Sequence, residues 1–148
     1  MTDVRFQCEI LRASRKRLSD VLEITDPEIL FKIPQGHCIT SQQRHMYMRS
    51  GLPMQISREF EAALKIGSSP RTWEMIPDVN KLKFLLTHTV DQLELDLESG
   101  LFVNYEPFNL PLGFQVNNHI EALQAAIYHE AEHSGVILMF LKLLGSKS

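Results

Sequence analysis

Cysteine is scarce in this chain. Its 148 residues include only Cys8 and Cys38, and neither belongs to a CxxC pair. A small disulfide-stapled domain carries more cysteines than this, and a CxxC pair is the usual redox or zinc motif. We therefore expect no disulfide scaffold, and we expect the protein in the reducing cytoplasm.

Long apolar runs and a basic excess are also missing. The most apolar stretch, residues 136–144, contains a lysine and is far shorter than the roughly 20 residues of a membrane span. Charges interrupt the N-terminal segment, so we expect no secretory signal. The net charge is −3 and the pI is about 6.1, so we expect no nucleic-acid partner, because nucleic-acid binding needs a clustered basic field. The local basic run is expected to be the solvated face of a helix; it comprises Arg12, Arg15, Lys16 and Arg17.

The length and the balance of 44% apolar and 22% charged residues predict one globular domain over residues 1–148. Helical periodicity and breaker residues predict long helices over 3–24, 37–49, 79–98 and 117–144, with a short extra helix over 56–66. Residues 100–116 contain Pro107, Pro111 and Gly113 and are expected to form a long loop. No segment has a convincing strand pattern. The predicted fold is an all-α, antiparallel four-helix bundle.

Two of these helices have apolar stripes that should face the core. Asp78 is expected to cap the start of the helix over 79–98. The first helix has its stripe at Phe6, Ile10, Leu11, Leu18, Val21 and Leu22. The helix over 79–98 has its stripe at Leu82, Leu85, Leu86, Thr89, Leu93 and Leu97.

The sequence HEAEH, residues 129–133, stands on the last predicted helix. Residues four apart on a helix lie one above the other, so His129 and His133 can present two imidazoles to one metal ion. The same letters fit the HExxH pattern of zinc proteases, where the glutamate is the general base. Here Glu130 lies about 100° around the helix from His129, so it is expected to support the site or to face solvent. It is not expected to be a base.

A catalytic zinc needs a third protein ligand. No histidine, aspartate, glutamate or cysteine follows His133, so the ligand has to come from upstream. His119 is about 15 Å away along the same helix and is excluded. The remaining candidates are His37, His45, His88, Cys38 and Asp91. Periodicity alone does not choose between them.

Several short motifs resemble the DinB-like (YfiT-like) superfamily of metal-dependent helical-bundle proteins, in particular its bacterial stand-alone members. The motifs follow one another in the family's order along most of the chain. They are KIPQG (32–36), GH followed by TSQQ (36–43), SGLPM (50–54), KIGSSP (65–70) and HEAEHSGVI (129–137).

The resemblance implies a divalent metal ion held by three histidines. Two are His129 and His133, and the Gly-His pair placed sixteen residues before Pro53 supplies His37. Family members have a longer polar stretch before this pair, which is here fused into PQGH, so His45 stays the alternative third ligand. The ion is expected to be zinc, nickel or iron.

The leading functional hypothesis is a cytoplasmic metal-dependent transferase or hydrolase. Its substrate is expected to be a small molecule, for which the resemblance suggests a low-molecular-weight thiol. A metal-free helical bundle that serves as an interaction module is the alternative, and an HExxH zinc protease comes third. Because residues 136–144 are apolar nearly all round the helix, we also expect a homodimer. The alternative is that the loop over 100–116 covers this segment.

Overall fold

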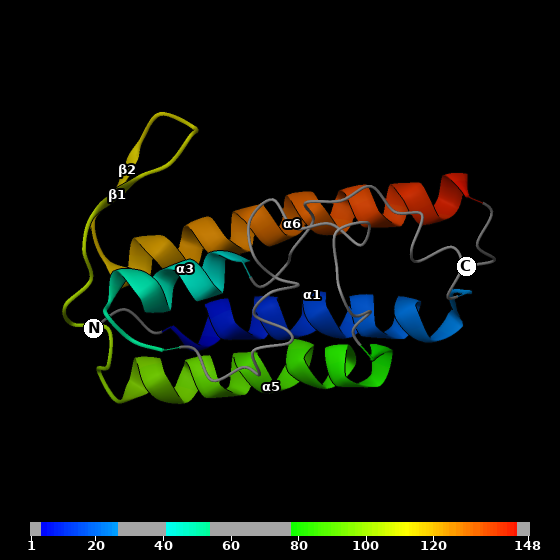
Figure 1. The fold of residues 1–148 in the computed structure, drawn as a ribbon, viewed down its shortest axis with the longest axis horizontal. Helices are drawn as coiled ribbons and strands as arrows, with labels where there is room; N and C mark the ends of the chain where they lie inside the picture. Colours follow the sequence, from blue (N-terminus) through cyan, green and yellow to red (C-terminus); the bar gives the residue numbers. More distant parts are fainter. Residues whose placement is uncertain (1–3, 27–40, 54–77, 145–148) are drawn as a thin grey trace.

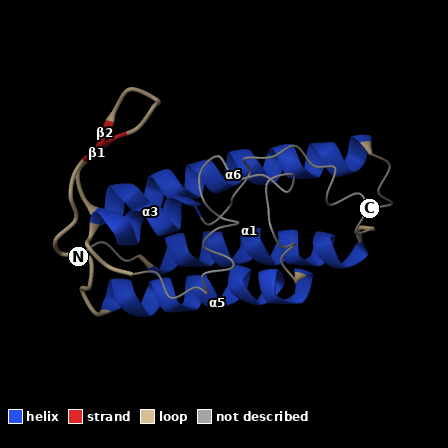
Figure 2. Cartoon of the chain, viewed as in Figure 1, coloured by secondary structure: helices blue, strands red, loops and turns tan. Residues whose placement is uncertain are grey.

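The computed structural model describes residues 4–26, 41–53 and 78–144. Within these ranges the chain forms four helices: α1 (Arg5–Ile24), α3 (Ser41–Arg49), α5 (Val79–Glu98) and α6 (His119–Leu143) (Figures 1 and 2). The bounds of α1, α5 and α6 agree with the predicted helices to within two residues. The first residues of the predicted helix over 37–49, and the whole predicted helix over 56–66, lie outside the described ranges.

The helices lie side by side in an arrangement consistent with a helical bundle. Helix α1 packs against both α5 and α6, and α3 packs against α6. Helices α1 and α6 run in one direction and α3 and α5 in the other (Figure 1). The packed pairs α1–α5 and α3–α6 are therefore antiparallel, whereas α1 and α6 are parallel. A membrane-crossing helix, which has to be both long and apolar, does not occur among the described residues.

Side-chain caps fix where α5 and α6 begin. The Asp78 carboxylate accepts hydrogen bonds from the amides of Asn80 and Lys81, at 2.8 and 3.2 Å, which confirms the predicted cap. Asn118 caps α6 in the same way, through its side-chain oxygen. Each cap satisfies amide groups that have no partner within the helix.

The core stripe of α5 is close to the predicted one. Leu86, Thr89, Leu93 and Leu97 are buried, and Val90, which was not expected there, is fully buried as well. Leu82 and Leu85 are only half-buried.

The predicted stripe of α1 is partly wrong. Leu11 and Leu18 are buried as expected, but Phe6 is 71% exposed and Ile10 is also exposed. The buried positions of α1 fall at 8, 11, 15 and 18, a spacing of three and four residues that defines one face of the helix. Phe6 and Ile10 lie off that face.

The region 100–116 contains a hairpin that the sequence did not predict. Strands β1 (Phe108–Asn109) and β2 (Gln115–Val116) pair antiparallel. A turn closes them, in which the amide of Gly113, at φ 90°, donates to the carbonyl oxygen of Leu110. Strand β2 contacts α6, and the hairpin lies near the beginning of that helix (Figure 1). The alternative to the homodimer, that this loop covers residues 136–144, is therefore wrong.

Candidate metal centre and the polar core beside it

The two histidines of HEAEH meet on the surface of α6. Their Nε2 atoms are 2.6 Å apart, and the ring planes are inclined at 72°. Both side chains are half-buried. Two imidazoles bound to one tetrahedral zinc ion, at Zn–N distances near 2.0–2.1 Å, have nitrogens about 3.3 Å apart. The pair therefore fits two coordination positions of one ion after a small opening of the side-chain torsions.

The described ranges do not supply the third ligand. No three histidine, cysteine, aspartate or glutamate side chains come together within residues 4–26, 41–53 and 78–144 in a way that could hold an ion. His88 is exposed and stacks on Phe84, with ring centroids 5.0 Å apart. Asp91 binds the guanidinium of Arg12. His37 and Cys38 lie outside the described residues.

His45, the alternative third ligand, belongs to a different part of the molecule. Its ring packs against Phe108 of the hairpin, with centroids 4.3 Å apart, and its buried Nε2 has no hydrogen-bond partner among the described residues. Burial, followed by the charges of Arg49 and Arg44, lowers the pKa of its imidazole. His45 is therefore a packing residue that does not join His129 and His133.

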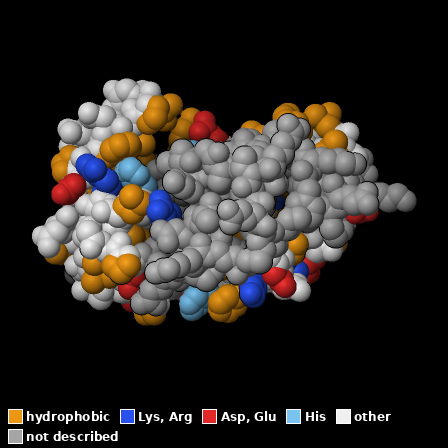
Figure 3. Space-filling model, viewed as in Figure 1, with side chains coloured by type: hydrophobic (Ala, Val, Ile, Leu, Met, Phe, Trp, Pro, Cys, Tyr) orange, Lys and Arg blue, Asp and Glu red, His pale blue; other side chains and the backbone are white. Residues whose placement is uncertain are grey.

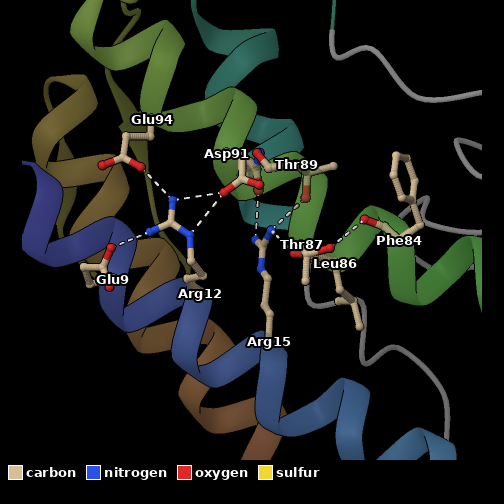
Figure 4. A network of polar contacts seen from close by, with 10 residues as sticks. Glu9, Arg12, Arg15, Phe84, Leu86, Thr87, Thr89, Asp91 and Glu94 are labelled. Atoms are coloured by element: carbon tan, nitrogen blue, oxygen red, sulfur yellow. Dashed lines mark hydrogen bonds and ion pairs between the residues drawn. The ribbon is translucent and has the colours of Figure 1, made fainter.

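Glu130, the residue after His129, belongs to a buried polar network that joins all four described helices. Arg15 of α1 and Glu130 of α6 are 0% and 1% exposed. The Arg15 Nε donates to one oxygen of Glu130 at 3.0 Å, and Nη2 donates to the other. Arg15 also donates to the side chains of Gln43 on α3 and Thr89 on α5, both at 2.8 Å, and to the carbonyl oxygen of Leu86. Figure 4 shows Arg15 reaching from α1 toward Leu86 and Thr89.

These contacts satisfy the whole guanidinium group. Arginine has five N–H donors, and Arg15 makes five hydrogen bonds. Gln43 closes the network by donating from Nε2 to the carbonyl oxygen of Thr89 at 2.8 Å. A buried charge is tolerated only where it is paired and hydrogen-bonded in this way. The network therefore holds the four described helices together where they meet around Arg15 and Glu130.

The expected positions of Arg15 and Glu130 have to be corrected. Arg15 does not lie on a solvated face, because it occupies the same helix face as Leu11 and Leu18. Of the two positions expected for Glu130, the solvent-facing one is wrong, since the residue is 1% exposed and both carboxylate oxygens accept hydrogen bonds from Arg15. Burial raises the pKa of the Glu130 carboxyl, and the hydrogen bonds and charge of Arg15 oppose that shift.

The other residues of the basic run do lie at the surface. Arg12 binds Glu9, Asp91 and Glu94 on the outer side of the α1–α5 pair (Figure 4). Lys16 forms an exposed ion pair with Asp20 at 2.7 Å. Here the expectation of a solvated helix face is right.

Comparison of the chain with models of protein families, with curated proteins and with solved structures gave no match. The structure shows a small, mostly helical protein with four described helices. The DinB-like resemblance rests on the sequence motifs alone.

Proposed function

We propose that this chain is a DinB-like metal-dependent protein in which His129 and His133 hold one divalent ion. The observation that carries the proposal is the convergence of the two Nε2 atoms, 2.6 Å apart across one turn of α6. Two imidazole nitrogens that converge in this way can bind one metal ion together. Zinc, nickel and iron all accept imidazole nitrogen.

His37 is the third ligand in this proposal. Its assignment comes from the position of the Gly-His pair in the sequence motif. It is supported by the location of His45, His88 and Asp91, which bind or pack elsewhere among the described residues. Since His45 packs against Phe108, Cys38, beside His37 in the sequence, takes its place as the alternative.

The proposed activity is that of a transferase or hydrolase acting on a small molecule, with a low-molecular-weight thiol as one substrate class. A bound ion of this kind supplies a Lewis acid with a position open to substrate. His129 and His133 hold the ion, and the Arg15–Glu130 pair fixes the rotation of the helix that carries them. Because Arg15 binds both oxygens of Glu130, a protease mechanism that uses this glutamate as its base is not supported.

Metal binding should show the pH dependence of imidazole ligands. A histidine must be neutral to bind a metal, and its ordinary pKa is about 6.5. We expect purified protein to bind one divalent ion per chain at pH 7.5 and to release it progressively below about pH 6.5. Elemental analysis after dialysis at a series of pH values measures this. Retention of the ion at pH 5, or equal metal content in His129→Ala, would contradict the assignment.

The end of α6 supports self-association as a homodimer. Met139 and Leu143 are 50% and 72% exposed, and Figure 3 shows hydrophobic side chains along the edge formed by the second half of α6. Exposed apolar side chains that gather in one place mark interaction surfaces. We expect light scattering to give twice the chain mass, and Met139→Lys/Leu143→Lys to give the monomer.

A matched control for the dimer is Val103→Lys, since Val103 is 74% exposed and lies in the loop after α5. This variant should keep the mass of the dimer. A monomer in the unmodified protein at high micromolar concentration would refute the dimer.

A further inference from the structure

A pocket of about 170 Å³ lies on the seam between α3 and α5. Two side-chain hydrogen bonds cross this seam, from Gln43 to Thr89 and from Tyr47 to Asp96. At about 30 Å³ per water molecule the pocket has room for roughly six waters. Pockets for drug-sized ligands are about 300–1,000 Å³, so this one suits a much smaller molecule. The pocket belongs to a part of the bundle that the histidine pair does not use.

The pocket has an apolar wall, formed by Leu52, Pro53 and Leu101, and polar side chains that stand at regular helical spacing. Helix α5 contributes His88, Gln92 and Asp96, each four residues after the last, and α3 contributes Gln43 and Tyr47. Residues four apart share one face of a helix. A polar stripe on a helix usually faces solvent. Here the polar residues of α3 and those of α5 both line the pocket. The arrangement brings hydrogen-bonding groups of both helices to one small space.

Asp96 gives the pocket its charge. The Asp96 carboxylate accepts from the Tyr47 hydroxyl and from Gln92 Nε2, the latter at 2.9 Å. Both donors are neutral, and no lysine or arginine in the described ranges forms an ion pair with this half-buried carboxylate. Burial and the bond to Asp96 raise the pKa of the Tyr47 hydroxyl, which stays protonated as a donor.

The carboxylate still has capacity for a ligand. An ionised carboxylate offers about four lone-pair positions, of which Tyr47 and Gln92 use two. A charge that is partly removed from water is stabilised most by an opposite charge that also donates hydrogen bonds.

We propose that this pocket binds a small organic cation, an alkylguanidinium or alkylammonium ion, with Asp96 as its counter-ion. The Gln92 amide oxygen accepts a second N–H of the ligand. The site is distinct from the histidine pair, because neither His129 nor His133 lines the pocket. The binding does not depend on a metal ion.

The test compares methylguanidinium with N-methylurea, a neutral molecule of nearly the same shape. Protein treated with a chelator is titrated with each compound and followed by ¹⁵N NMR. We expect methylguanidinium to shift the side-chain amide signals of Gln92 and Gln43 saturably, with a dissociation constant in roughly the millimolar range for so small a ligand. N-methylurea at the same concentrations should leave these signals in place.

Asp96→Asn removes the charge and keeps an acceptor for Tyr47. We expect it to weaken the binding of methylguanidinium by about tenfold or more. The matched control is Glu98→Gln, which removes a charge from the same helix on the side that binds Arg5 and should bind as the unmodified protein does. Non-saturable shifts, equal effects of the two compounds, or unchanged binding by folded Asp96→Asn would each overturn the proposal. If Asp96→Asn does not fold, the comparison of the two compounds on the unmodified protein still decides.

Discussion

Replacing Arg15 by alanine should lower the free energy of unfolding by about 3–5 kcal/mol, the cost of breaking a buried ion pair by removing one partner. Glu130, 1% exposed, would then be a buried charge with no cation. Gln43 and Thr89 would each lose a hydrogen bond from Arg15 as well. For a chain of this size the loss is a large part of the total stability. Urea denaturation followed by circular dichroism measures it.

Arg12→Ala is the matched control for this variant. Arg12 is on the same helix and binds three carboxylates, but it is 30% exposed and two of its partners, Glu9 and Asp91, lie at the surface, so its removal should cost less than that of Arg15, about 1 kcal/mol. A second comparison is Arg15→Met combined with Glu130→Leu, which replaces the ion pair by apolar side chains and should cost less than Arg15→Ala alone. Equal losses for Arg15→Ala and Arg12→Ala would show that the buried pair does not hold the helices together.

His133→Ala should weaken the binding of a divalent ion by more than about 100-fold. Loss of a residue that only supports a ligand typically costs 10–100-fold in metal affinity, and removal of the ligand itself should cost more. His88→Ala is the control, since His88 is exposed on α5 and stacks on Phe84, and we expect it to leave the affinity unchanged. Competition against a chromophoric chelator measures both constants. Equal affinities for the two variants would refute the role of His133.

Much of the helical architecture could be predicted from the sequence, because caps and breakers act locally. Asp78 marks the beginning of α5 through bonds to amides two and three residues away, and such bonds depend only on neighbouring residues. The meeting of His129 and His133 is local for the same reason, since both stand on one helix. The hairpin was missed because its strands are two residues long, too short for an alternating pattern.

The polar core was missed for a different reason. Arg15 stands at the spacing of the buried stripe of α1, between Leu11 and Leu18, and Glu130 stands four residues after buried Ala126. A search for apolar residues passes over such positions, although the spacing was visible. Nothing local indicates that an arginine and a glutamate 115 residues apart form a pair. The proposed third metal ligand, His37, has the same difficulty, because it is far from His129 and His133 in the sequence.

In the proposed metal centre, one divalent ion is held by three imidazoles, those of His37, His129 and His133. X-ray absorption at the zinc edge of zinc-loaded protein tests it most directly, since imidazole ligands and sulfur ligands differ in distance and in scattering pattern. We predict three imidazole nitrogens at about 2.0–2.1 Å, falling to two in His37→Ala. A shell with a sulfur at about 2.3 Å would identify Cys38 as the third ligand. A shell of oxygens with no imidazole scattering would contradict the account altogether.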